Sequence, residues 1–305
     1  MGGFVRTRAA GFALAAVLVF AACTNGGAPP PADAPGTVVV GSFDFPESEV
    51  LAQVYAQALA AKDIPVRLEL NLGPRELVTP ALLRGLVHLV PEYQGSALDF
   101  LTRAGDATKD PAATHDSLEE ALAGTSAAAL RSAAAQDANA FAVTRETADR
   151  YGLQAISDLA PVSRKLVIGG SPECPERPLC LRGLQDVYGL RFRDFYPLDA
   201  GGPLTVAALA GGQVDVALVF TSDPVVAARG FVILDDDRGL EPAENVTPIV
   251  SRSILARHGD RLRGALDAVS AALTTDQLIG MNRAVARGRS AAEVAGSWLT
   301  GQGLS

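Results

Sequence analysis

A helix, a glycine and a buried strand that ends in an aromatic residue occur twice in this chain, and the recurrence limits the folds open to it. Gly85 and Tyr93 in the first copy align without a gap with Gly212 and Phe220 in the second. Both copies continue into small polar residues. Open α/β sheets bind ligands beyond the carboxyl ends of their strands, so two such units predict two lobes facing a cleft. Chance recurrence of ordinary α/β sequence over so short a stretch is the alternative.

Strand and helix signals alternate along the neighbouring sequence. The β-branched run over 37–42 ends at a glycine and predicts a first buried strand. Pro46 suits the first turn of a helix, and apolar residues recur at three and four positions over 47–61. A second strand is expected at 66–72, and a further helix and strand at 77–93. This β-α-β order predicts a parallel sheet.

The remaining chain continues the same alternation. Residues 102–117 are polar and predict a loop, followed by an Ala- and Leu-rich helix over 117–134. Strands are expected at 140–144, 166–170, 192–197, 214–220, 231–234 and 247–250. Helices are expected at 146–151, 181–188, 204–210, 259–273, 275–287 and 290–299.

Two crossings between lobes follow from this order. The chain leaves the first lobe near 137–143 and returns near 244–250. We therefore expect a first lobe made of 37–138 and 244–305, and a second lobe made of 139–243. Two crossings of this kind permit the lobes to close on a ligand about a hinge.

The N-terminal residues are expected to direct export. Arg6 and Arg8 precede an apolar run over 11–22 that is too short to span a bilayer as a mature helix, which predicts a signal peptide over 1–22. Small residues before Cys23 resemble a bacterial lipobox, which predicts lipidation of Cys23. A plain secretory signal with an incidental cysteine is the alternative. The Gly-, Pro- and Ala-rich residues 23–36 predict a flexible tether that holds the domain at the outer face of the cytoplasmic membrane.

Charge and cysteine content exclude several classes of function. The net charge is −8 and no basic stripe occurs, so nucleic acid is not an expected partner. In an exported protein, Cys174 and Cys180 favour a short-loop disulfide. The three histidines are far apart in sequence and none neighbours these cysteines. We therefore expect neither a metal nor a cofactor.

An ordered series of motifs resembles the osmoprotectant solute-binding proteins, the glycine betaine/choline/carnitine receptors (ProX/OpuAC-like) of ABC importers. The likeness runs through nearly all of 37–299. It rests on GSFDFPE at 41–47, LGPRE at 72–76, PEYQG at 91–95, GLQDVYGL at 183–190, FTSD at 220–223 and MN at 281–282. The resemblance implies a type II periplasmic-binding-protein fold, an α/β architecture of two lobes joined by two crossover strands with the ligand between them. It also implies no catalytic activity, a monomer, and delivery of a solute to a permease and ATPase complex.

The chemistry of such a ligand explains the residues that the family uses. A quaternary ammonium cannot donate hydrogen bonds, so aromatic faces hold it by cation–π attraction and apolar contact. A carboxylate on the ligand favours a bidentate arginine. The resemblance implies a box of tyrosines for the ammonium and an arginine for the carboxylate.

Carried over residue by residue, the resemblance predicts a cleft with fewer aromatic walls. Tyr93 matches a box tyrosine, and Phe220 matches another without its hydroxyl. Asp137 falls where the family has a polar contact, with hinge hydrogen bonding as the alternative. Asn139 and Val206 stand at the other two aromatic positions. The resemblance therefore predicts a quaternary ammonium ligand, with another small polar or aromatic molecule as the alternative.

Four further candidates, together with one loop, complete the predicted site. Arg177 matches the carboxylate arginine, with an ion pair to Glu173 or Glu176 as the alternative. Phe43 and Asp44 follow the first strand, Ser42 offers a hydroxyl or fits a tight turn, and Thr221 is a contact or a turn residue. The glycine-rich loop at 199–205 precedes a helix whose free N–H groups could bind an anion, with a structural αβ turn as the alternative.

Two other functions compete with an importer's receptor. An enzyme on a two-lobed scaffold is disfavoured because the sequence holds no G-x-S-x-G, H-E-x-x-H or P-loop motif. A lipoprotein that binds a ligand and signals to a membrane partner stays open.

Overall fold

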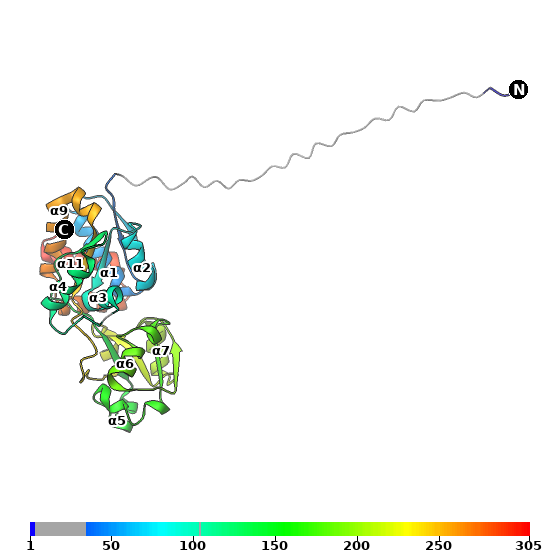
Figure 1. Cartoon of the computed structure of the whole chain (residues 1–305), viewed down its shortest axis with the longest axis vertical. Helices are drawn as coiled ribbons and strands as arrows, with labels where there is room; N and C mark the ends of the chain where they lie inside the picture. Colours follow the sequence, from blue (N-terminus) through cyan, green and yellow to red (C-terminus); the bar gives the residue numbers. More distant parts are fainter. Residues whose placement is uncertain (4–34, 104) are drawn as a thin grey trace. The chain divides into compact units, whose positions relative to one another are not determined.

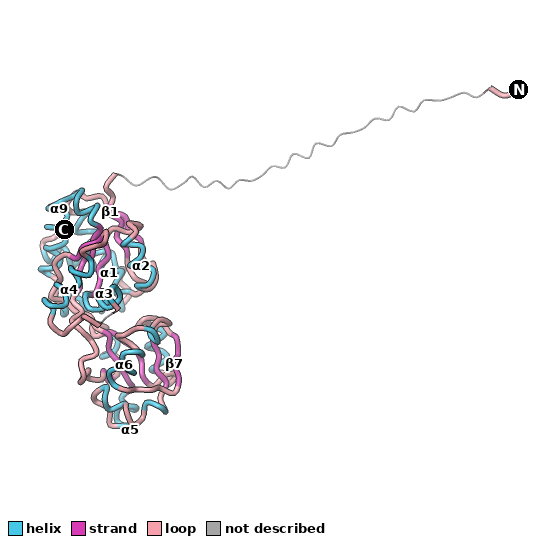
Figure 2. Tube along the Cα trace, viewed as in Figure 1, coloured by secondary structure: helices cyan, strands magenta, loops and turns pink. Residues whose placement is uncertain are grey.

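The computed structural model describes residues 1–3, 35–103 and 105–305. Residues 4–22 of the predicted signal peptide, Cys23 and most of the predicted tether lie outside the described residues. From residue 35 onward the chain falls within one compact unit. This unit contains two five-stranded sheets, drawn in magenta in Figure 2.

The first sheet has the strand order β2-β1-β3-β10-β4. Its strands are β1 (Val38–Gly41), β2 (Val66–Glu69), β3 (Leu89–Tyr93), β4 (Ala127–Ala129) and β10 (Val246–Ser251). β1 pairs in parallel with β2 and β3, as the β-α-β order predicts, whereas β10 is antiparallel to β3 and β4. With β10 the chain thus returns from the second lobe to this sheet, where β10 pairs with β3.

The second sheet has the strand order β7-β6-β8-β5-β9. Its strands are β5 (Asn139–Val143), β6 (Val167–Gly170), β7 (Asp194–Pro197), β8 (Val216–Phe220) and β9 (Val232–Ile233). β6 is parallel to β7 and β8, and β5 is antiparallel to β8 and β9. The order matches that of the first sheet, with one incoming antiparallel strand beside the central parallel ones.

Helices flank both sheets (Figure 1). Those of the first are α1 (Pro46–Ala60), α2 (Arg75–Leu83), α3 (Gln94–Thr102), α4 (Pro111–Leu122), α9 (Arg252–Ala272), α10 (Thr275–Ala286) and α11 (Ala291–Gln302). The second lobe has α5 (Arg145–Tyr151), α6 (Leu181–Tyr188), α7 (Pro203–Ala210) and α8 (Pro224–Ala228). Short 3-10 turns occur at Ile156–Leu159, Ser163–Lys165 and Cys174–Glu176.

The core of the first lobe forms around α1, which packs against α9, α10 and α11. Tyr55, in the middle of α1, is fully buried, and its hydroxyl lies 3.0 Å from Ser270 Oγ. β1 and β3 are buried along their whole length, which explains the continuous apolar run of β1. α1 therefore holds its N-terminus, just beyond β1, in a fixed place.

The predicted loop over 102–117 and helix over 117–134 are wrong. The helix is α4, which begins at Pro111 and ends at Leu122, and the alanines of β4 then pair with β10. The Asp110 carboxylate accepts hydrogen bonds from the N–H groups of Ala112 and Ala113, and Pro111 needs no N–H partner. The cap and the proline fix the start of this helix earlier than alanine content suggested.

Two helices begin where polar residues predicted a break in the chain. Gln94 directly continues β3 into α3, and Pro224 starts α8 after the polar residues that follow β8. α9 also begins earlier than expected, at Arg252, and kinks at Gly259, where φ is +56°. Glycine adopts this conformation without a Cβ clash, so it divides the helix where the prediction placed its start.

Two chain segments run between the sheets and pair with each other. Gln136 and Asn245 form an antiparallel bridge, and the N–H of Asp137 donates to the carbonyl of Glu244 at 3.1 Å. These are the crossover segments of the predicted two-lobed α/β fold.

Candidate ligand-binding site

A cavity of about 360 Å³ lies between the two sheets. Strand ends, helix starts and the crossover segments of both lobes form its wall. The lining residues are Phe43, Asp44, Phe45, Pro74, Arg75, Glu76, Tyr93, Ser96, Asp99, Phe100, Asp137, Asn139, Ser171, Pro172, Glu173, Arg177, Pro178, Leu179, Leu198, Asp199, Ala200, Leu218, Phe220 and Glu244.

Four aromatic rings form one stacked group on the cavity wall, with Phe45 at its centre. The Phe45 ring centroid lies 5.8 Å from that of Phe43, 6.2 Å from that of Tyr93 and 5.6 Å from that of Phe220. Phe45 was not among the predicted site residues. The signal for it was its spacing from Phe43, since two aromatic residues two positions apart follow the first strand directly.

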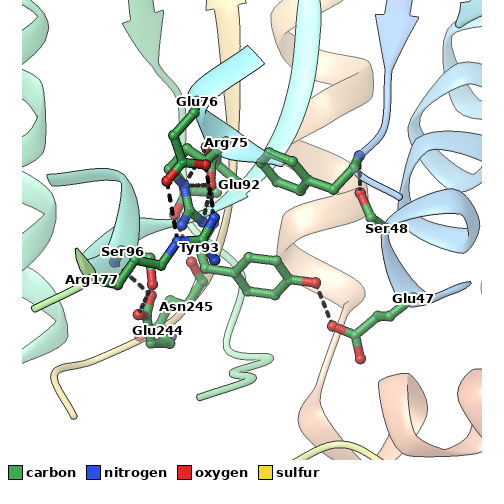
Figure 3. Close-up of polar contacts among 12 residues, drawn as sticks. Glu47, Ser48, Arg75, Glu76, Glu92, Tyr93, Ser96, Arg177, Glu244 and Asn245 are labelled. Carbon is green, nitrogen blue, oxygen red and sulfur yellow. Dashed lines mark hydrogen bonds and ion pairs between the residues drawn. The ribbon is translucent and has the colours of Figure 1, made fainter. Parts of the chain in front are cut away.

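Tyr93 joins this group to a buried carboxylate. Its side chain is 5% exposed, and its hydroxyl donates to Glu47 Oε1 at 2.5 Å (Figure 3). Burial, followed by the charge of Glu47, raises the pKa of Tyr93 well above its ordinary value. The phenol is therefore a neutral donor, and its hydrogen bond to Glu47 holds the ring in place at the cavity.

Glu47 connects three elements and was missed by sequence reasoning. Besides Tyr93, its carboxylate accepts hydrogen bonds from Ser222 Oγ and from the side-chain amide of Asn282. Ser222 follows β8 in the second lobe, whereas Asn282 lies in α10 of the first. One buried carboxylate thus ties both lobes together beside the aromatic group.

Asp137 lies in a crossover segment and lines the cavity. Its Oδ1 accepts from the Ser222 N–H at 2.8 Å and from Thr221 Oγ1 at 3.2 Å. Burial, followed by the negative charge of Glu47, raises the pKa of Asp137 well above its ordinary value. These contacts match the hinge alternative for Asp137. Thr221 lies outside the cavity wall, where its hydroxyl also accepts from the N–H of Ala138.

Asn139 is at the wall, where it supports the disulfide loop. Its Nδ2 donates to the carbonyl of Leu179 at 2.8 Å, and Asn139 faces Phe220 in the β5–β8 register. Val206 is buried and does not line the cavity. Of the two positions where the family has aromatic residues, one therefore holds a polar residue at the cavity wall. The other, Val206, is not part of the wall.

Ser42 lies outside the wall because its hydroxyl shapes the turn after β1. It donates to the carbonyl of Phe43 and accepts from the N–H of Asn71, both at 2.9 Å. Phe43 is 2% exposed and contributes its ring to the wall, whereas Asp44 is exposed at the rim. The tight turn thus presents Phe43 and Asp44 to the cavity while Ser42 points away.

Arg177 forms a bidentate ion pair across the cavity with Glu76 (Figure 3). Its Nε lies 3.2 Å from Glu76 Oε1 and its Nη2 lies 2.8 Å from Oε2, whereas Glu173 is 4.0 Å away. Burial opposes ionisation of Glu76, but the hydrogen bond from Arg177 holds its pKa below the ordinary value. Neither alternative acid named from the sequence is the main partner.

Arg75 is likewise paired. Its Nη2 lies 2.9 Å and its Nε 3.0 Å from the Glu92 carboxylate, which is nearly fully buried. The guanidinium carbon also lies 5.3 Å from the centroid of the Phe43 ring. Arg75 therefore packs over the Phe43 ring next to the aromatic group.

An acidic pole occupies the end of the cavity at the start of α3. The Glu244 carboxylate accepts from Ser96 N–H at 3.0 Å and from Ser96 Oγ at 2.5 Å (Figure 3), and burial raises its pKa to about 7. Asp99 Oδ1 and Ser171 Oγ, both buried in the wall, have no hydrogen-bond partner among the described residues. Ser96 and Asp99 were missed because helix α3 itself was not predicted. Ser171 directly follows β6 and Glu244 lies in the second crossover segment, so the position of these two residues was a signal that sequence reasoning did not use.

The loop before α7 has no free N–H groups for an anion at its first turns. Asp199 Oδ2 accepts from the N–H of Leu204 at 2.9 Å, and Oδ1 accepts from the N–H of Thr205 at 2.8 Å. These contacts match the structural-turn alternative for 199–205, because a carboxylate of the chain itself takes the N–H groups.

The two remaining cysteines are paired, with Cys174 Sγ 2.01 Å from Cys180 Sγ. Within the described ranges, no group of three or more His, Cys, Asp or Glu side chains is placed to hold a metal ion. Among the same residues, no helix is long and apolar enough to cross a membrane.

The profile of the substrate-binding domain of ABC-type glycine betaine transport systems matches residues 36–301. The chain belongs to this family. The resemblance seen in the sequence is therefore confirmed, and so is its class, since these are substrate-binding proteins of ABC transporters and not enzymes.

Individual relatives are similar over most of their length. The glycine betaine-binding protein YehZ of Escherichia coli (strain K12) is 28% identical over 287 residues, which cover 90% of this chain and 93% of the relative. A glycine-betaine-binding protein of Pseudomonas aeruginosa is 29% identical over 233 residues, 73% of this chain and 74% of that one. A crystal structure described as a glycine betaine/carnitine/choline ABC transporter has a TM-score of 0.68 at 24% identity. It covers 88% of this chain and 99% of that one, and it confirms the two-lobed α/β fold.

Proposed function

We propose that this protein binds a small quaternary ammonium osmolyte, of the kind of glycine betaine, choline or carnitine, in the cavity between its lobes. The observation that carries the proposal is the stacked group of Phe43, Phe45, Tyr93 and Phe220 on the wall of a cavity rich in carboxylates. Aromatic faces attract ammonium cations through the ring quadrupole, and methyl groups gain apolar contact with the same faces.

The carboxylates support the same ligand class. Seven Asp and Glu side chains and two arginines line the cavity, so its field favours a cation. A quaternary ammonium has no N–H group and needs no hydrogen-bond acceptor, so contact with an aromatic ring is sufficient to hold it. The four rings serve as the site, with Asp137 and Asn139 shaping the hinge side of it and Asp44 at the rim.

The proposal extends to the setting of the protein. Residues 1–22 are a signal peptide that is removed, Cys23 carries lipid, and the tether holds the domain at the outer face of the cytoplasmic membrane. The protein is a monomer with a first lobe made of 37–138 and 244–305 and a second lobe made of 139–243. The two lobes close on the ligand and deliver it to an ABC permease and its ATPase. Membrane retention that is unchanged when Cys23 is replaced by Ser would contradict the lipid anchor.

A thermal-shift screen with choline, glycine betaine and carnitine tests the ligand class. A ligand that binds only the native state adds RT ln(1 + [L]/Kd), about 2.7 kcal/mol at a hundredfold excess over Kd. We expect a shift with at least one of these compounds. Tyr93→Ala removes one aromatic face worth ~0.5–2 kcal/mol, a loss of about 2- to 30-fold in affinity. Trp298→Ala on α11, away from the cavity, is a control aromatic truncation that should keep the wild-type Kd. No shift with any ammonium compound would contradict the proposal.

A further inference from the structure

The groups that could receive a ligand carboxylate in this cavity are already occupied by carboxylates of the chain. Arg177 is paired in bidentate fashion with Glu76, and Arg75 is paired with Glu92. These are the two arginines among the described lining residues. A zwitterion entering the cavity therefore finds no unpaired guanidinium on its wall.

Backbone donors at the cavity are filled in the same way. Asp199 takes the N–H groups at the start of α7, and Glu244 takes the N–H of Ser96 at the start of α3. Two cationic side chains and two helix starts thus each carry an internal carboxylate. Helix N-termini and arginines are the usual receptors for an anionic group, and those on this wall are occupied, which leaves Ser171 Oγ as a neutral hydroxyl without a partner among the described residues.

A positively charged ligand, by contrast, meets a cavity wall with an excess of carboxyl groups. Even with Asp99, Asp137 and Glu244 all protonated, four of the seven lining carboxyl groups remain against two guanidinium groups. Asp99 Oδ1 is buried in the wall without a hydrogen-bond partner among the described residues. A hydroxyl on the ligand can pair with the Asp99 carboxyl group in either protonation state, whereas a ligand carboxylate can pair only with its protonated form.

We propose that Glu76 determines ligand selectivity: by occupying Arg177 it excludes carboxylate-bearing zwitterions, so that the cleft selects net-cationic quaternary ammonium compounds of the choline type. This inference rests on the proposed function and names the charge class of its ligand. To bind a zwitterion such as glycine betaine through Arg177, the protein must first break the Arg177–Glu76 pair and leave Glu76 beside a second negative group. Choline requires no such exchange, because its positive end faces the rings and its hydroxyl is a donor.

Isothermal titration of the wild type with choline, tetramethylammonium and glycine betaine tests the charge class. The three probes share methylated nitrogen, and tetramethylammonium lacks both the hydroxyl and the carboxylate. We expect choline and tetramethylammonium each to bind at least about tenfold more tightly than glycine betaine, which corresponds to ~1.4 kcal/mol. Glycine betaine that binds as tightly as choline would overturn the inference while leaving the proposed function intact. If no probe binds, both fail together.

Glu76→Gln tests the residue. The change frees Arg177, so the ratio of the glycine betaine Kd to the choline Kd should fall about tenfold or more, the worth of a hydrogen bond to a charged group. Glu76→Gln combined with Arg177→Gln should lose this gain. The matched control is Glu69→Gln, which removes the acid of an exposed Arg67–Glu69 pair in the same lobe and should leave the ratio unchanged. An unchanged ratio in Glu76→Gln would overturn the assignment.

Arg177→Gln alone separates the two roles of this arginine without relying on the Glu76 variant. If Glu76 holds Arg177, the substitution unpairs Glu76 and should tighten choline binding without weakening that of glycine betaine. If Arg177 receives the ligand carboxylate, as the sequence predicted, glycine betaine binding should weaken at least about tenfold. The second result would overturn the inference.

Discussion

The side chain of Tyr93 serves two purposes with its two ends. Its ring stacks with Phe45 at 6.2 Å and faces the cavity, whereas its hydroxyl donates to the buried carboxylate of Glu47 at 2.5 Å. In the proposed function the ring contributes to ligand binding, whereas the hydroxyl belongs to the hydrogen-bond network of Glu47, so substitutions can separate the two.

Tyr93→Phe keeps the ring and removes the donor. We expect the free energy of unfolding to fall by ~1–3 kcal/mol, because Glu47 loses one of its partners in a buried site. The affinity for the ammonium ligand should fall less than in Tyr93→Ala. Urea unfolding and titration of both variants measure the two effects. Equal losses of affinity in the two variants would contradict the division of roles.

Glu244 gives stability a pH dependence of known sign. Burial raises its folded pKa to about 7 from an ordinary value of 4.5, so between these values the native state holds a proton that the unfolded state has lost. The free energy of unfolding should therefore fall by ~3 kcal/mol as pH rises through this window, from this group alone. Glu244→Gln keeps an acceptor for Ser96 and should flatten the fall, measured by urea unfolding between pH 5 and pH 8. Glu69→Gln, exposed in the same lobe, should leave it unchanged.

A position at or just after a strand end predicted some of the lining residues. Tyr93, Phe220, Phe43 and Asp44 line the cavity, whereas Ser42 and Thr221, which directly follow β1 and β8, do not. Glu47 was not predictable, because an acid in the first turn of a helix is ordinary and its partner Ser222 is distant in sequence. The partner of Arg177 was missed for the same reason, since only the fold brings α2 to the disulfide loop.

Helix α6 depends on the absence of a side chain at Gly183. A Cβ at this position would lie 1.8 Å from the carbonyl oxygen of Pro178 and 2.5 Å from Leu240. The backbone of the disulfide loop therefore touches the first turn of the helix, and this contact holds the loop that carries Arg177. Gly264 in α9, by contrast, has open space around the corresponding position.

Alanine at these two helical glycines should have opposite effects. Gly264→Ala should stabilise the protein by ~0.5–1 kcal/mol, the usual gain from alanine in a helix. Gly183→Ala should destabilise it by more than this amount, because backbone must move to admit the methyl group. Thermal or urea unfolding of the two variants measures the difference. Equal effects would show that the loop is not packed on α6.

The elements that sequence reasoning missed share a cause. α3 begins with Gln94 and Gly95, residues that normally suggest a turn, but both are buried together with Ala97, Leu98 and Asp99, and this packing continues the chain as a helix. α4 carried a local signal in Asp110 and Pro111, but the alanine content downstream outweighed it. β4 consists of three alanines that form a strand only because β10 lies beside them. Local preference decides little where tertiary pairing supplies the hydrogen bonds.

The two lobes contact each other through polar side chains as well as through the crossover segments. Ser222 of the second lobe donates to Glu47 of the first at 2.5 Å, and Arg177 reaches Glu76 on α2. A two-lobed binding protein of this fold works by closing about a hinge, so the buried Ser222–Glu47 contact favours the closed arrangement before any ligand enters. The Arg177–Glu76 pair is partly exposed and contributes less to closure.

Ser222→Ala removes the Glu47 contact on the second-lobe side and should shift the ligand-free protein toward open forms. Because the apparent Kd is the intrinsic Kd divided by the competent fraction, affinity should fall in proportion to the closed population that is lost. Small-angle scattering should show a larger radius of gyration without ligand and a return to the wild-type value at saturation. Ser126→Ala, which removes a serine hydrogen bond within the first lobe to Leu83, is the control and should change neither quantity. A weaker affinity with an unchanged ligand-free radius would mean that Ser222 acts on the site directly and not through closure.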